Sequence, residues 1–329
     1  MLGVGVDEQS RNSGSICPAV NWEVPAMCSG ESNRPGSCGQ GAGATVRRVM
    51  GFGVVAAMLA TVTACPPTTP TPSSEFDSTP FFVDEFSGSG RPDWPTWKLG
   101  DGFSWNDEWN TARPKNVRVE GGRMVIEAHA EEFEGKHFTS SMAWSTESFL
   151  FGKFEARIRV PTGTGTWAGF WFNCVPGPET VPERDRTCNP PWPAGGEIDM
   201  LEHVANPTMA EGLGWAHSNL HLGRDALGYL DNHRNTSTLV DPPAGPAGWH
   251  TYGVEWVPGE IRFFIDGRRT ATHRKSDEGP NGWWPFDTVP QEMRFALQLG
   301  GWVGTVDASA MPQQMQIDWV RGYRYVGPR

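Results

Sequence analysis

Beyond residue 80, hydrophobic and polar residues alternate along the chain with the two-residue period of a β-strand. In the stretch 154–160, Phe, Ala, Ile and Val alternate with Glu and Arg, which predicts a strand with one buried and one solvent-facing side. Alternating stretches at 117–119 and 124–128 flank a Glu-Gly-Gly turn, and the stretch 263–265 precedes Asp-Gly, so both regions predict hairpins. No long stretch of the sequence has the period of an amphipathic helix. The pattern therefore predicts an all-β protein, an antiparallel β-sandwich.

Three carboxylates, Glu197, Asp199 and Glu202, interrupt one apolar, strand-like run. On a regular strand Glu197 and Asp199 point to one side and Glu202 points to the other. One extra residue, a β-bulge at Met200 or Leu201, would turn Glu202 back beside the other two, and bulges are frequent next to active sites. We therefore expect the three acids to share one concave face of a strongly bent sheet.

Such a triplet has the chemistry that cleaves a glycosidic bond. Crowded carboxylates do not all ionise freely, so at least one holds a proton near neutral pH. A retaining glycosidase needs one carboxylate as nucleophile and a protonated one as general acid, about 5 to 5.5 Å apart. Glu197 is then the nucleophile, Glu202 the acid/base, and Asp199 the group that orients Glu197. An acidic surface strand or a set of oxygen ligands for calcium are the alternatives.

The surrounding sequence resembles a known family. Residues 192–204, Trp-Pro-Ala-Gly-Gly-Glu-Ile-Asp-Met-Leu-Glu-His-Val, are similar to the signature of glycoside hydrolase family 16 in its bulged form. Further stretches look like landmarks of this family in the family's order: 113–119, 151–157, 167–171, 252–256 and 315–321. The resemblance covers roughly residues 80–326. It implies a jelly-roll β-sandwich of two curved antiparallel sheets with a concave substrate cleft.

Within the family, the bulged motif and the stretch 284–302 look most like the laminarinase branch. This resemblance implies a retaining endo-β-1,3-glucanase that forms a covalent glycosyl-enzyme intermediate. The chain departs from that branch at 300–304, where it has Gly-Gly-Trp-Val-Gly and laminarinases usually carry Gly-Gly-Asn-Trp-Pro-Gly. A galactan hydrolase or transglycosylase on the same fold is the alternative among enzymes. A non-catalytic surface glycan-binding protein is the alternative outside them, and the intact acid triplet argues against it.

Tryptophan is abundant, with 16 residues in the chain, and its large apolar ring can stack on the C–H faces of sugars. The resemblance places five substrate-binding candidates near the cleft: Trp167, Trp171, Trp302, His221 and Arg113. For the tryptophans the alternative is a place in the core, and for His221 a place on the surface. We expect Trp256 and Trp319 to be core residues.

The formal net charge of −11 argues against nucleic acid or an anionic membrane surface as partner, because both require basic patches. A polysaccharide substrate fits this charge, and we expect a monomer. Catalysis by carboxylates requires no cofactor. The resemblance implies a structural calcium held by Glu85, a backbone oxygen near Gly121, and Asp318, although Asp318 could equally be an exposed strand residue.

Residues 47–65 have the pattern of an export signal, with two arginines, an apolar run and Val-Thr-Ala-Cys at the end. This ending looks like a bacterial lipobox, which implies lipidation of Cys65 and a cell-surface or periplasmic lipoprotein. The apolar run is shorter than the ~20 residues of a membrane span; a buried helix ending in cysteine is the alternative. We expect a misassigned start or disorder in 1–45, a lipoprotein signal in 46–65, a Pro/Thr/Ser linker in 66–79 and the catalytic domain in 80–329.

Only Cys174 and Cys188 remain in the expected exported domain. Export permits disulfides, so we expect these two to form one rather than to remain free thiols. A loop of about 15 residues closed in this way gains ~3 kcal/mol in the chain-entropy model.

Overall fold

The computed structural model describes residues 75–92, 95–104, 107–174, 190–209, 213–223, 234–239, 248–279 and 282–328. They belong to a compact unit that spans residues 65–329. The predicted export signal with Cys65, and the predicted disulfide partner Cys188, lie outside the described ranges and stay predictions. Packed structure begins earlier than the expected boundary at residue 80, because the Phe76 side chain is buried and its ring lies 5.9 Å from that of Tyr325.

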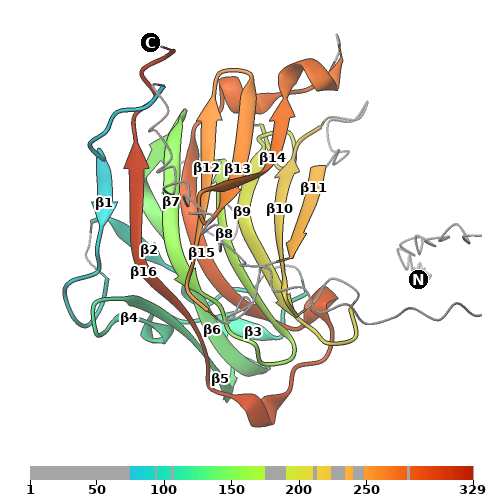
Figure 1. Cartoon of the computed structure of the whole chain (residues 1–329). Helices are drawn as coiled ribbons and strands as arrows, with labels where there is room; N and C mark the ends of the chain where they lie inside the picture. Colours follow the sequence, from blue (N-terminus) through green and yellow to red (C-terminus); the bar gives the residue numbers. More distant parts are fainter. Residues whose placement is uncertain are drawn as a thin grey trace, which may run out of the picture. The chain divides into compact units, whose positions relative to one another are not determined.

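Strands make up most of the described chain, with short 3-10 helices between some of them (Figure 1). The strands are β1 (Phe82–Asp84), β2 (Trp97–Leu99), β3 (Asn110–Ala112), β4 (Val117–Val119), β5 (Met124–Phe133), β6 (Lys136–Phe149), β7 (Gly152–Arg159), β8 (Thr166–Cys174), β9 (Glu197–Ala205), β10 (Trp215–His221), β11 (Arg234–Leu239), β12 (His250–Val257), β13 (Glu260–Ile265), β14 (Arg268–Arg274), β15 (Gln291–Leu299) and β16 (Gln313–Tyr323). The 3-10 helices are η1 (Pro114–Asn116), η4 (Lys275–Glu278), η5 (Pro285–Asp287), η6 (Gly301–Val303) and η7 (Ala308–Ala310). Within the described ranges, we find no helix with the length and apolar character needed to cross a membrane.

The strands are hydrogen-bonded in the order β11-β10-β9-β8-β15-β6-β5-β16-β7-β12-β13-β14. The first six form one curved layer and the last six form the other, and the β5–β6 pair joins the two (Figure 1). Short strands extend the layers: β1 pairs with β16, β2 and β3 with β6, and β4 with β5. Apart from the parallel β3–β6 pair, the strand pairs of the described residues are antiparallel. The predicted jelly-roll sandwich is confirmed.

The hydrophobic alternation found in the sequence corresponds to this architecture. On β7, Phe154, Ala156 and Ile158 are fully buried, and the residues between them point outward. The predicted hairpins are β4–β5 and β13–β14. In the first, the turn between Val119 and Met124 contains Gly121 at φ 58°, a conformation that glycine adopts without a Cβ clash.

The core lies between the two layers and is rich in aromatic side chains. Phe170 of β8 stacks on Phe295 of β15, with ring centroids 4.6 Å apart. Trp256 is fully buried, as expected from the sequence. Trp319 is only half-buried, and the Arg321 guanidinium lies 4.3 Å from its ring centroid. The prediction of a core position for Trp319 is therefore wrong, because the pairing of β16 with β7 shifts register between Ile317 and Trp319, and the buried positions continue at Val320 and Gly322.

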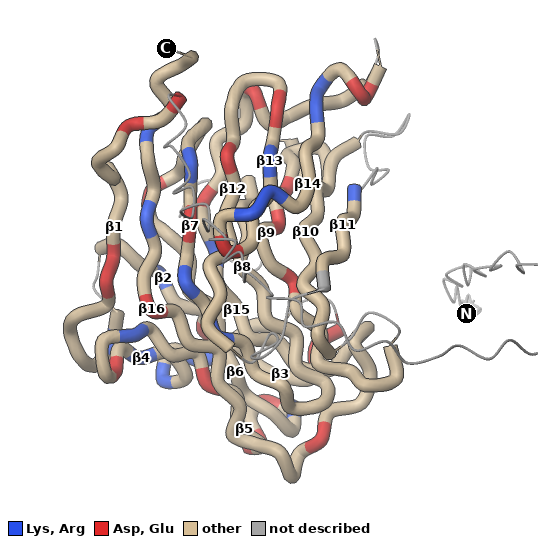
Figure 2. Tube along the Cα trace, in the orientation of Figure 1, with Lys and Arg blue, Asp and Glu red and all other residues tan. Residues whose placement is uncertain are grey.

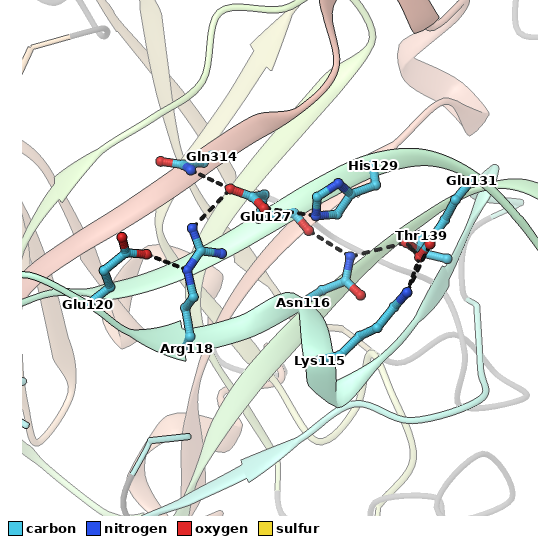
Figure 3. Close-up of polar contacts among 9 residues, drawn as sticks. All are labelled: Lys115, Asn116, Arg118, Glu120, Glu127, His129, Glu131, Thr139 and Gln314. Carbon is cyan, nitrogen blue, oxygen red and sulfur yellow. Dashed lines mark hydrogen bonds and ion pairs between the residues drawn. The ribbon is translucent and has the colours of Figure 1, made fainter. Parts of the chain in front are cut away.

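The outer side of the second layer is polar, and Figure 2 shows charges of both signs along β7 and β16. Figure 3 shows one network of such residues on η1, β4, β5, β6 and β16. At its centre, the Glu127 carboxylate pairs with Arg118 at 3.1 Å and with His129 at 2.8 Å, and it accepts a hydrogen bond from Gln314. Buried Asn116 donates to the Glu127 backbone oxygen at 2.8 Å. These contacts join β4, β5 and β16 on the side away from the core.

Candidate active site

Strand β9 carries the three predicted acids, and one extra residue interrupts its pairing with β8. Trp171 lies opposite Asp199, whereas the preceding Phe170 lies opposite Leu201. Met200 therefore has no register partner on β8. The pairing of β9 with β10 shifts in the same region. The predicted β-bulge is confirmed, at Met200.

The bulge decides which side chains point into the core. Ile198, Met200 and Leu201 are all buried in the main hydrophobic cluster, and Met200 and Leu201 are consecutive in the chain. Because two consecutive residues point inward, the alternation restarts one residue later, and Glu202 returns to the face of Glu197 and Asp199. We call this side of β8, β9, β10 and β15 the acid face.

Two side chains hold the Glu202 carboxylate. The indole Nε1 of Trp167 donates to its Oε1 at 3.1 Å, and the Asn219 amide Nδ2 donates to its Oε2. Trp167 comes from β8 and Asn219 from β10, the two strands that flank β9. Glu202 is thus fixed from both sides of its own strand.

Glu197 is held from β8 and β15. Asn173, its register partner on β8, donates from Nδ2 to Glu197 Oε2 at 2.5 Å. Arg294 of β15 bonds Glu292 Oε1 at 2.7 Å, and its positive charge acts on Glu197. Glu197 also shares a hydrogen bond with Asp199.

Asp199 is the most enclosed of the three acids, with 2% of its surface exposed. His221 Nε2 lies 3.3 Å from Asp199 Oδ2. The exposed ring of Trp192 lies 5.6 Å from the His221 ring, centroid to centroid. Within the described residues, Glu197, Asp199 and His221 are also the group whose potential metal-ligand atoms all lie within 4.8 Å of one another.

Burial dominates the electrostatics of the triplet. It raises the pKa of Glu202 to about 6, and the neighbouring Glu197 carboxylate acts in the same direction. Burial, followed by the charge of Asp199, raises the pKa of Glu197. Burial also raises the pKa of Asp199. Because Glu197 and Asp199 are hydrogen-bonded to each other, we assign one shared proton to this pair near neutral pH.

The predicted tryptophans occupy different environments. Trp302 is exposed over 54% of its surface, and its ring contacts that of Trp167 edge to face at 5.1 Å. Trp171 is half-buried against a second, smaller hydrophobic cluster that contains Met142 and Trp144. Trp167, which bonds Glu202, and Trp302 therefore form one aromatic surface, whereas Trp171 packs against the smaller cluster and lies opposite Asp199.

Other predicted residues lie in contacts of their own. The Arg113 guanidinium stacks on the Phe133 ring, 3.7 Å from its centroid. Of the two carboxylates expected to bind calcium, Glu85 pairs with Arg321 at 2.9 Å and Asp318 pairs with Arg157 at 2.6 Å. In this structure both carboxylates are thus paired with arginines, and the calcium site stays a prediction.

The fully buried Cys174 is disulfide-bonded. It ends β8, the strand that pairs with the acid-bearing β9. A disulfide at this position ties the end of β8 covalently to another part of the chain.

Asn173, Asn219, Trp192 and Trp109 were not predicted as site residues. Asn173 has a period-two relation to Trp171, and Asn219 has the same relation to His221, so strand periodicity could have placed both asparagines on the acid face. Trp192 precedes the acid motif in an irregular segment, where no period applies. Trp109 is exposed and packs against Gly300, a contact between segments far apart in the sequence.

Comparison with known proteins links this geometry to a family. The model described as "Glycosyl hydrolases family 16" matches residues 106–321. A beta-glucanase from Rhodothermus marinus is 36% identical over 258 residues, which are 74% of this chain and 84% of that protein. A keratan-sulfate endo-1,4-beta-galactosidase from Sphingobacterium multivorum is 27% identical over 249 residues, 73% of this chain and 54% of that protein.

A solved structure has the same architecture. The laminarinase from Rhodothermus marinus superposes with a TM-score of 0.62 at 34% identity, covering 75% of this chain and 97% of that one. The similarity thus includes nearly all of that solved chain, and the family match includes strand β9 with its three acids.

Proposed function

Because this chain belongs to glycoside hydrolase family 16, we propose that it is a retaining endo-β-1,3-glucanase with Glu197 as nucleophile and Glu202 as acid/base. The family membership makes it a glycoside hydrolase. The observation that carries the finer proposal is the bulge at Met200, which puts both glutamates on one face with Asp199 between them.

In the first step, a Glu197 carboxylate oxygen attacks the anomeric carbon of the sugar. Glu202 donates its proton to the glycosidic oxygen as the bond from that oxygen to the anomeric carbon breaks. The products are a covalent glycosyl-enzyme and a shortened glucan with a free hydroxyl. A carboxyl with a pKa of about 6 suits this donation, since it holds a proton in mildly acidic solution and releases it readily.

In the second step, Glu202 takes a proton from water, and the resulting hydroxide oxygen attacks the anomeric carbon. The bond to Glu197 breaks, and the sugar leaves with its original configuration because two inversions have occurred. Glu202 is then protonated again and ready for the next cycle.

Asp199 supports the nucleophile through the shared proton. When the proton lies on Asp199, its O–H donates to Glu197, which is then an anion with a neutral neighbour. When the glycosyl bond neutralises Glu197, Asp199 keeps the shared proton, so neither member of the pair carries a charge. This arrangement avoids two adjacent buried anions at every stage.

The laminarinase similarity supports β-1,3-glucan as the substrate, since that structure shares 34% identity with this chain. Trp302, whose ring contacts that of Trp167, supplies an exposed aromatic platform for a sugar ring. The keratan-sulfate endo-β-galactosidase relative keeps a galactan-type substrate as the second candidate.

The test is reducing-sugar release by the purified protein from laminarin, mixed-linkage β-glucan, xyloglucan, agarose and keratan sulfate. Glu197→Gln and Glu202→Gln are assayed in parallel, with Glu132→Gln, an exposed residue of β5, as the matched control. We expect release from laminarin that both active-site variants abolish and the control retains. Proton NMR of the first products should show the β-anomer. Activity on keratan sulfate or agarose alone would show that the substrate is a galactan-type glycan and not β-1,3-glucan. No release from any glycan would refute the proposal.

A further inference from the structure

Asn219 has an unusual relation to Glu202. In the β9–β10 pairing, His217 lies opposite Glu202 and Asn219 lies opposite Asp199. The Asn219 amide nevertheless donates to Glu202, along the diagonal that the extra residue Met200 creates. Asn219 is 4% exposed, so this amide contacts the carboxylate without competition from bulk water.

The other end of the same amide has no partner. Asn219 Oδ1 is buried and accepts no hydrogen bond from the described residues. Turning the amide by 180° would bring Oδ1 to Glu202 and the NH₂ group to the position that Oδ1 now occupies. Because Oδ1 has no hydrogen bond there, the turn would break no contact of Oδ1. After such a turn, Oδ1 could accept a hydrogen bond from the protonated form of Glu202. An asparagine can thus serve both protonation states of its neighbour, whereas the indole of Trp167 can only donate.

We propose that Asn219 is a positioning residue that binds both forms of Glu202, as donor to the carboxylate and as acceptor from the acid, and thereby sets the upper limit of the pH range in which the enzyme works. This inference rests on the proposed role of Glu202 as the acid/base. It concerns a residue that contacts the acid/base rather than the sugar.

Among the described residues, the other ionisable groups around Glu202 lie on β9, β10 and β15. Glu197 and Asp199 share its strand, and His217 and His221 lie on β10. Strand β8, on its other side, contains no ionisable side chain except the disulfide-bonded Cys174. Arg294 on β15 acts on Glu197. His217 Nδ1 bonds Ser237 at 3.0 Å, and His221 Nε2 lies 3.3 Å from Asp199, while the charge of His221 acts to lower the pKa of Glu202.

The direction of the effect follows from which form each partner favours. The bond that the amide donates to the carboxylate is charge-assisted and therefore stronger than the neutral bond that the turned amide accepts from the acid, so the loss of Asn219 makes Glu202 hold its proton to higher pH. Asn219→Ala removes the donor. Asn219→Asp keeps the shape but replaces the donor with a second carboxyl, whose negative charge favours the protonated form of Glu202 still more.

The first measurement is the pH dependence of kcat/KM, whose basic limb reports the group that must be protonated. We expect Asn219→Ala to move this limb upward by about one pH unit and Asn219→Asp to move it further. The matched control is Asn235→Ala, since Asn235 is an exposed asparagine that faces Asn219 from β11. It should leave the limb in place. A purely structural role would lower activity at all pH values without moving the limb.

The second measurement does not depend on activity. With the glutamates labelled at the carboxyl carbon, ¹³C NMR follows the titration of Glu202, whose signal is identified by its loss in Glu202→Gln. Asn219→Ala should raise the midpoint of this titration. If the wild-type protein cleaves no glycan but the midpoint still rises, the proposed function fails and the contact is upheld. If the enzyme is active and neither the limb nor the midpoint moves, the proposal for Asn219 is wrong.

Discussion

Asn173 and Glu197 face each other across β8 and β9, with the Asn173 amide Nδ2 2.5 Å from Glu197 Oε2. The donor fixes the rotation of the carboxylate that we propose as nucleophile and stabilises its charge. It comes from the strand whose next residue, Cys174, is disulfide-bonded. The nucleophile is therefore positioned by a β8 side chain next to a covalently fixed point of the backbone.

Asn173→Ala should lower kcat by about 10- to 100-fold with a small change in KM, because the contact acts on the reacting group rather than on the bound sugar. The steady-state rate on laminarin checks this prediction. The control is Asn235→Ala, since Asn235 is an exposed residue of β11 whose side chain bonds Ser237. An unchanged kcat in Asn173→Ala would show that the amide does not position Glu197.

Deleting Met200 should remove the bulge and restore regular alternation along β9. Leu201 would then be the one inward-facing residue between Asp199 and Glu202, so Glu202 would stay on the acid face, and we expect activity to be retained at a lower Tm because one buried side chain is lost. Met200→Leu keeps the residue count and nearly the volume, and should cost less than about 1.5 kcal/mol. Thermal melts and activity assays of the deletion variant and of Met200→Leu test this prediction. A folded deletion variant that had lost activity would contradict this account of the bulge.

The buried acids should make stability depend on pH. The pKa of Glu202 is raised to about 6 in the folded protein, above its ordinary value. The folded state then binds the proton more tightly than the unfolded state, so the contribution of Glu202 is favourable in acid and is lost as the pH rises from about 4 through 6. Glu202→Gln should accordingly raise Tm at about pH 8 and leave it nearly unchanged at about pH 4.

Glu127 gives the control of opposite sign. Burial acts to raise the pKa of Glu127. Hydrogen bonds from Arg118 and Gln314 outweigh this effect and hold the pKa below its ordinary value. Its contribution to stability is present above the unfolded pKa and is lost as the pH falls through the folded one. Glu127→Gln should therefore lower Tm at neutral pH. If Glu202→Gln and Glu127→Gln shifted Tm in the same direction and with the same pH dependence, this assignment would be wrong.

Asn116 should matter for stability rather than catalysis. Its amide donates to the Glu127 carbonyl at 2.8 Å and to Thr139 Oγ1 at 3.1 Å, and it is 1% exposed. Asn116→Ala leaves both acceptors without this donor and should cost about 1 to 3 kcal/mol. Chemical denaturation measures the loss. Lys115→Ala, which removes an exposed ion pair with Glu131, should cost less than about 1 kcal/mol and is the control.

Trp302 should contribute to substrate binding. Its exposed ring lies against Trp167, whose indole bonds Glu202. Trp302→Ala should raise KM for laminarin several-fold with kcat largely kept, and Trp302→Phe should retain part of the affinity because a smaller aromatic face remains. Val83→Ala on β1, also exposed, should change neither constant. If kcat falls and KM stays constant, Trp302 acts on the chemistry through Trp167 instead.

The sequence by itself determined the strands and the acid motif. Period-two alternation is a local property, so β7 and the hairpins β4–β5 and β13–β14 could be predicted from residues close together in the chain. The spacing of Glu197, Asp199 and Glu202 predicted a bulge, because one extra residue is what returns Glu202 to the common face. The core position of Trp319 was wrong, since aromatic character alone does not say which face of a strand a residue occupies.

Only the tertiary structure decided the partners of those acids. Asn173 and Asn219 reach β9 from strands 24 and 17 residues away from the glutamates they bind, and no local pattern fixes that register. The pairing of Glu85 and Asp318 with arginines likewise depends on which strands lie side by side. Hydrogen bonds and pKa values depend on three-dimensional distance and burial, and a sequence specifies these only after the layers have packed.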